Sequence, residues 1–186
     1  MSPPRVFGRW LPRNDWEGDD RTPGAKGKFV TCQDTAVGRM VAWATNGRID
    51  EDGKVYREAV PGHDPNGITL LQAQIAVGAV AHLPLIIPKN WGSANVKTHL
   101  RYGRGLVLNG MYSAVPRAYR YQKFADFPHA MWVSHLTTKG LIRLWDPLNP
   151  DIHAYGRFVP AGVIWGFLIS LDYICGYVPL QIQGED

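Results

Sequence analysis

The change of hydrophobic period along the chain limits its fold more than any other feature. Around residues 32–45 apolar side chains recur every three to four positions, which is typical of a helix with one buried face. From about residue 105 the apolar residues alternate or form short runs, which is typical of strands. The expected strands cover residues 105–112, 129–136, 140–145, 156–159, 162–169 and 173–182. Helices followed by strands predict an α+β fold, with N-terminal helices packed on a C-terminal antiparallel sheet.

A second helix is expected to begin at Thr69, in "TLLQAQIAVGAVAH". Gln72 follows Thr69 by three residues, which is the pattern of a capping box. Between the two helices, residues 46–67 are rich in turn-forming residues and are expected to form a loop.

The N-terminal residues differ from the rest of the chain. Residues 1–28 are rich in proline and have neither helical nor strand periodicity, so we expect an extended arm. Residues 29–186 then form one domain, and this length is enough for a real core. Trp10 and Trp16 are unusual in a solvated tail. We therefore expect the arm to pack on the domain or on a neighbouring protein.

The formal net charge of +4 suits an anionic partner, such as a cell-wall polymer or a nucleic acid. Arginines interleave with tyrosines in residues 101–104 and 117–123, a pattern that occurs on nucleic-acid-binding surfaces. More often such a stretch is a solvated loop or a rim that recognises an anionic polymer, and we do not predict nucleic-acid binding.

No membrane span is expected, because Pro160, Asp172 and Pro179 interrupt the most apolar stretch, residues 158–182. This stretch is interpreted as buried strands. The N-terminus lacks the apolar segment of a secretory signal, which predicts synthesis in the cytoplasm.

Cys32 lies in "GKFVTCQDTAVGRMVAW", where an extended run gives way to the first helix. A thiol there meets unpaired backbone N–H groups and the positive end of the helix dipole, and both favour the thiolate. A small buried hydrophobe is the commoner role of a cysteine. Cys175 lies in a strand-like run and is expected in the core, and a bridge between the two cysteines is left open.

A base for the Cys32 thiol is available in "FPHAMWVSHLTTKGLIRLWDPLNPD". If the turn centres on Thr138 and Lys139, His129 faces about residue 148 across a hairpin. Asp146 is then a diagonal neighbour on the same face of the sheet. A carboxylate there could accept from one imidazole nitrogen and leave the other for a thiol. Nucleophile, base and orienting group are the parts that thiol catalysis needs.

These residues carry a family resemblance. A cysteine at a helix start, then "YGRGLVLNGMY", "HAMWVSH" and "IRLWDPL", resembles the papain-like cysteine peptidases, most closely the bacteriocin-processing, C39-like branch. The resemblance covers about residues 27–170. It implies helices packed on a half-barrel and peptide substrates, with Cys32 as nucleophile, His129 as general base and acid, and Asp146 as orienting group. No cofactor is implied.

The chain departs from this family at one position. The family has a glutamine about six residues before the cysteine, which donates to the oxyanion, and Lys26 stands there instead. The Cys32 backbone N–H can supply one donor; Gln33 and Lys28 are weak candidates for the second. Loss of one such donor typically costs about 10²–10³ in rate.

Two function classes therefore stay open. The first is a thiol hydrolase that cuts peptide or amide bonds, with peptidoglycan cross-peptides as a plausible substrate. The second is a non-catalytic papain-like component of a larger assembly, such as a phage tail or capsid, with residues 1–28 contacting its neighbours. A metal site built from His135, Asp151 and His153 is disfavoured, because the spacing fits no usual zinc motif.

Overall fold

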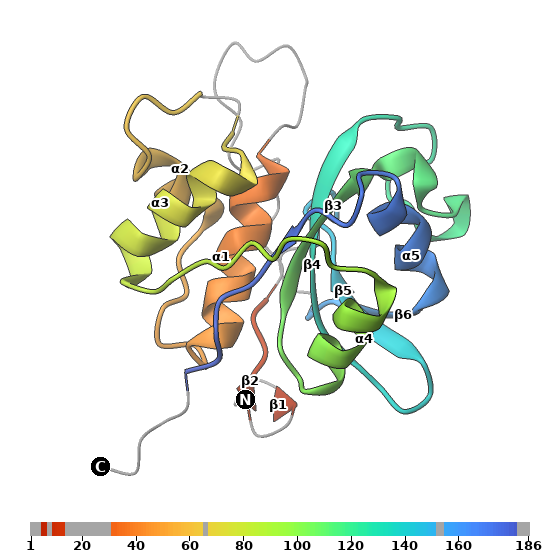
Figure 1. The fold of residues 1–186 in the computed structure, drawn as a ribbon. Coiled ribbons are helices and arrows are strands. Elements are labelled where there is room, and N and C mark those ends of the chain that lie inside the picture. Colours follow the sequence, from red (N-terminus) through yellow and green to blue (C-terminus); the bar gives the residue numbers. More distant parts are fainter. Residues whose placement is uncertain (1–4, 7–8, 14–30, 65–66, 152–154, 182–186) are drawn as a thin grey trace.

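The computed structural model describes residues 5–6, 9–13, 31–64, 67–151 and 155–181. The helices α1 (Cys32–Ala44), α2 (Gly53–Glu58) and α3 (Leu70–Ala81) form one half, on the left in Figure 1. The other half is a five-stranded antiparallel sheet in the order β6-β5-β4-β3-β7, with α4 (Ser93–Arg101) and α5 (Gly162–Ile169). The strands are β3 (Leu106–Met111), β4 (Pro128–Leu136), β5 (Leu141–Trp145), β6 (Arg157–Pro160) and β7 (Cys175–Gly176). The predicted α+β fold is confirmed.

Alternation along the central strands gives the sheet two apolar faces. Ala130 and Trp132 of β4 belong to a cluster with α1 and α3, whereas Met131 and Val133 belong to a cluster with α5. In β3, Val107 packs with the first cluster and its neighbours with the second. Both faces of these strands are therefore buried, and successive side chains alternate between the two clusters, as expected of strands.

Both predicted helix starts are confirmed. Cys32 is the first residue of α1, and Thr69 is the N-cap of α3. The Gln72 N–H donates to Thr69 Oγ1 at 3.2 Å, and the Thr69 N–H donates to Gln72 Oε1 at 2.9 Å, so the capping box is complete.

The expectations for the C-terminal quarter are partly wrong. Residues 162–169 form helix α5, not a strand, and of residues 173–182 only Cys175 and Gly176 are a strand. Residues 163–169 are one continuous run without a polar side chain, and periodicity cannot distinguish a short buried helix from a strand in such a run. Helix α2 lies within the expected loop, and α4 was not expected at all. Helix α2 has only six residues, and α4 has nine, of which only Val96 and Leu100 are buried apolar residues.

Part of the expected arm contacts the domain. Arg5–Val6 and Arg9–Trp10 form a two-stranded hairpin, β1–β2, and Leu11 is buried in the cluster with α1. The indole N–H of Trp145 donates to the Pro12 carbonyl at 3.1 Å. Trp16 and the side chain of Trp10 lie outside the described residues, so their part in packing stays a prediction.

In the described ranges, every helix is too short or too polar to cross a bilayer.

Candidate active site

The first turn of α1 holds Cys32 at the boundary between the two halves. Thr31 precedes the helix, and the Thr35 hydroxyl donates back to the Thr31 carbonyl at 2.9 Å. Asp34, fully buried, accepts from Arg57 of α2 at 2.9 Å. These contacts fix the helix start, where backbone N–H groups and the dipole favour negative charge. Cys32 itself is half-buried, and both cysteines are free thiols.

His129 enters the same region from the sheet. It is the second residue of β4, pairs with Gly110 of β3, and is only 2% exposed. Its Nε2 donates to Asp146 Oδ1 at 2.8 Å. The predicted diagonal pair is therefore present: Trp132 pairs with Trp145, and extending this register places His129 opposite residue 148. The turn between the strands is residues 137–140.

Asp146 is held by three donors. Besides His129, the Leu148 N–H donates to Oδ1 at 3.0 Å, and the Tyr112 hydroxyl donates to Oδ2 at 2.9 Å. The Tyr112 oxygen in turn accepts from the Tyr121 N–H at 2.9 Å, and its ring meets the His129 ring edge-on at 4.9 Å. Burial raises the pKa of Tyr112, so its hydroxyl keeps the proton that it donates. These three hydrogen bonds hold the Asp146 carboxylate in the position where it accepts from His129.

Tyr112 was not identified from the sequence. The signal available there was its position at the end of an apolar strand, "LVLNGMY", next to the strand that begins with His129. Without the register between these strands, a tyrosine at a strand end is indistinguishable from an ordinary core residue.

The charge state of His129 depends on Cys32. Burial by itself would lower the pKa of His129, but the charge interaction with Cys32 and the hydrogen bond to Asp146 raise it well above 6.5. Within the described residues, Nδ1 is buried and makes no hydrogen bond of ordinary geometry. Nδ1 is thus the nitrogen left for the thiol, and such contacts are often loose without substrate. An imidazolium beside a thiolate is the arrangement that activates a nucleophilic cysteine.

Two buried amides lie near these groups. Gln33, next to Cys32, is 5% exposed, and its Nε2 has no hydrogen-bond partner among the described residues. The same holds for Nδ2 of Asn109, which precedes Gly110 in β3. Asn109 was not identified from the sequence, because a single asparagine inside a strand carries no signal. Lys26 and Lys28 lie outside the described residues.

We expect the two thiols to differ strongly in reactivity. Cys175 is fully buried in β7, and burial raises its pKa to about 12, so almost no thiolate forms at neutral pH. Cys32 is half-buried at a helix start beside a cationic histidine. Brief alkylation with iodoacetamide at pH 7, followed by peptide mapping, should label Cys32 first. Equal or faster labelling of Cys175 would contradict this assignment.

Two further histidines, His99 and His135, are buried. His135 contacts the Ser134 hydroxyl and stacks on Trp43 with ring centroids 6.3 Å apart. Asp151 lies outside the strands and His153 outside the described residues. In the described parts of the chain no group of three potential ligands could hold a metal ion.

These histidines predict a loss of stability in mild acid. Burial, with Arg104 beside His99 and Arg143 beside His135, lowers the pKa of each to about 4 from 6.5. The unfolded chain therefore binds these protons first, and stability falls as the pH drops below 6.5. From pH 7 to pH 5 we expect a loss of about 2 kcal/mol per histidine. Urea unfolding at both pH values measures this loss, and His135→Phe should halve it. An unchanged loss in His135→Phe would contradict the assignment.

Comparison with known proteins adds information on the fold. No family model and no curated protein matches this sequence. Among solved structures, a candidate C39-like peptidase from Bacillus anthracis is similar with a TM-score of 0.59 and 9% identity, over 83% of this chain and 90% of that chain. At this identity the likeness establishes the fold alone. The chain therefore has the papain-like α+β fold of a C39-like peptidase, as its sequence predicts.

Proposed function

We propose that this protein is a thiol hydrolase that cleaves peptide or amide bonds, with Cys32 as nucleophile, His129 as general acid and base, and Asp146 as orienting group. The observation that carries the proposal is the buried pair of His129 and Asp146, together with the charge interaction between His129 and Cys32. The His129 Nε2 is bonded to Asp146 at 2.8 Å, and Cys32 raises the pKa of His129. The structural likeness to a candidate peptidase supports the same reading.

The reaction would follow from the charges of the pair. The Cys32 thiolate attacks the substrate carbonyl carbon, and the His129 imidazolium gives its proton to the departing amine. His129, now neutral, takes a proton from water, whose oxygen attacks the thioester. The acid product leaves, and the thiolate and imidazolium are restored. Asp146 stays ionised and keeps the ring oriented.

Gln33 is proposed as the side-chain donor to the oxyanion, together with the Cys32 backbone N–H. Its buried Nε2 lacks a partner within the described residues, and it adjoins the nucleophile. Gln33→Ala should lower kcat about 10²–10³-fold with little change in KM. Asn109→Ala removes the other unpaired amide and serves as the matched control. If Asn109→Ala lowers kcat and Gln33→Ala does not, the assignment to Gln33 is wrong.

Peptide chains of the bacterial cell wall are the proposed substrate. The chain's positive charge favours an anionic polymer of this kind. The experiment is to incubate the protein with purified cell-wall material and, separately, with a mixture of unstructured peptides, and to identify new amines by mass spectrometry. New ends in the wall material support this substrate, and new ends only in the peptides indicate a general peptidase.

The alternative is a structural component with the same fold, for example in a virion made in the cytoplasm. Replacement of the expected glutamine by Lys26 favours it. The hydrogen bonds around Asp146 favour the enzyme, because a scaffold has no need of a buried, charged histidine. If neither the cell-wall material nor the peptide mixture gains new amino ends, the hydrolase proposal is wrong and the structural role is the remaining one.

A further inference from the structure

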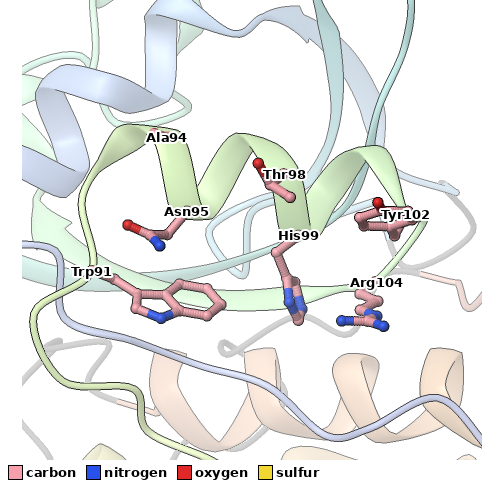
Figure 2. A pocket seen from close by; sticks show the side chains of 7 residues that line it. All are labelled: Trp91, Ala94, Asn95, Thr98, His99, Tyr102 and Arg104. Atoms are coloured by element: carbon pink, nitrogen blue, oxygen red, sulfur yellow. The ribbon is translucent and has the colours of Figure 1, made fainter.

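A pocket of about 290 Å³ lies beside α4, away from Cys32. Figure 2 shows its lining side chains, among them Trp91, Asn95, His99 and Arg104. Arg104 precedes the start of β3 at Leu106, whereas His129 pairs with Gly110 near the other end of that strand. Four residues of strand separate these points by about 13 Å. The pocket is therefore a second site, distinct from the proposed catalytic one.

His99 places an unused hydrogen-bond acceptor in this pocket. The residue is 4% exposed, and its ring lies 5.3 Å from the Trp91 ring and 4.3 Å from the Tyr177 ring. The Gly105 backbone favours the protonated ring, and within the described residues the buried Nε2 has no partner. We assign the proton of the neutral ring to Nδ1, which makes Nε2 an acceptor. Burial and Arg104 lower the pKa of His99 to about 4, which keeps the ring neutral. Nε2 is thus a buried lone pair that needs a donor.

Arg104 and Asn95 offer further donors in this pocket, and the Thr98 and Tyr102 hydroxyls can donate or accept. Arg104 forms no ion pair with any described carboxylate, and its guanidinium lies 5.5 Å over the Tyr102 ring. The Asn95 Oδ1 accepts from the Gly92 N–H at 3.2 Å, which leaves the Asn95 amide N–H groups for a ligand. A guanidinium and an amide in one pocket suit a carboxylate.

We propose that this pocket binds the C-terminal residue of a peptide. The terminal carboxylate would pair with Arg104 and Asn95, the N–H of the same residue would donate to His99 Nε2, and an apolar side chain would lie against Trp91. These three groups occur together on a peptide's last residue. A phosphodiester or a simple fatty acid has no N–H to satisfy His99. A pocket of this size is near the lower limit of small-molecule sites, which span roughly 300–1,000 Å³.

Three small probes test this binding by isothermal titration calorimetry. N-acetyl-L-leucine carries carboxylate, N–H and side chain. N-acetyl-L-leucinamide lacks the charge, and 4-methylpentanoate lacks the N–H. We expect N-acetyl-L-leucine to bind roughly tenfold or more tightly than either. The titrations use the Cys32→Ala protein, which cannot cut the amide bonds of the probes by the proposed route, so the result does not depend on whether Cys32 is catalytic.

Variants assign the contacts. Arg104→Gln should weaken binding of N-acetyl-L-leucine about tenfold or more, whereas Arg101→Gln, an exposed arginine at the end of α4 that does not line the pocket, should not. His99→Phe should remove the preference for N-acetyl-L-leucine over 4-methylpentanoate. Thermal unfolding verifies that all three variants are folded. The comparison of Arg104→Gln with Arg101→Gln is decisive by itself, because Arg104 is exposed and its replacement should not disturb the fold.

The proposal is overturned by any of three results. These are equal binding of the acid and the amide, equal binding of N-acetyl-L-leucine and 4-methylpentanoate by the protein with an unmodified pocket, or equal effects of Arg104→Gln and Arg101→Gln. The second result would indicate a simple anion site.

Discussion

Cys32→Ala is expected to lower the cleavage rate at least about 10⁴-fold, because the residual catalysis of a site without its nucleophile is small. The helix should be unaffected, since alanine is a good helix former and Cys32 is only partly buried. The measurement is the release of new amines from the substrate that the unmodified protein cuts, with circular dichroism and thermal unfolding to verify the fold.

Cys175→Ala is the matched control, because it removes the other of the two thiols in the sequence. Cys175 lies in β7 at the edge of the sheet, pairs with Leu108 of β3 and packs with the cluster that contains α5. The activity of the folded Cys175→Ala protein should stay within a few-fold of the original. Retained cleavage in Cys32→Ala would exclude the proposed mechanism.

Gly110→Ala is expected to destabilise the protein by about 3 kcal/mol or more, at the upper end of overpacking. A Cβ atom at Gly110 would lie 2.1 Å from the Phe167 carbonyl oxygen and 2.7 Å from its carbonyl carbon. The obstacle is backbone of α5, so no side-chain rotation can relieve it. Because Gly110 pairs with His129, the shift also reaches the proposed general base.

Gly78→Ala is the control for this substitution. Gly78 lies within α3, and no atom is within 4 Å of the place its Cβ would take. Alanine there should stabilise the helix by roughly 0.5–1 kcal/mol. Urea unfolding of the two variants should therefore give changes of opposite sign. A loss below about 1 kcal/mol for Gly110→Ala would show that α5 can move away from the sheet.

The sequence predicted the pieces that depend on local pattern. Cys32 at a helix start follows from one change of period, and the pairing of His129 with Asp146 follows from hairpin arithmetic across a four-residue turn. Tyr112 could not be predicted, because its contact with Asp146 depends on how β3 is aligned with β4. Helix α5 was misread, since its eight residues are apolar on every side. Gln33 was named from its place next to Cys32, whereas Asn109, a single asparagine inside a strand, carried no signal.

The two halves of the fold contribute different partners to the proposed reaction, Cys32 from α1 and His129 with Asp146 from the sheet. The proton would therefore cross the boundary between the halves, where Trp43 of α1 meets Trp132 of β4 at 5.9 Å. The chain joins the halves again at the Ile86–Tyr177 bridge, and the Gln181 N–H donates to Ala44 at the end of α1. A shift of α1 against the sheet by about an ångström would separate the thiol from the imidazole, and a misplacement of this size can cost about 10²-fold in rate. Alignment of the reacting groups therefore depends on how α1 packs against the sheet, and substitutions in this packing are expected to lower activity before they unfold the protein.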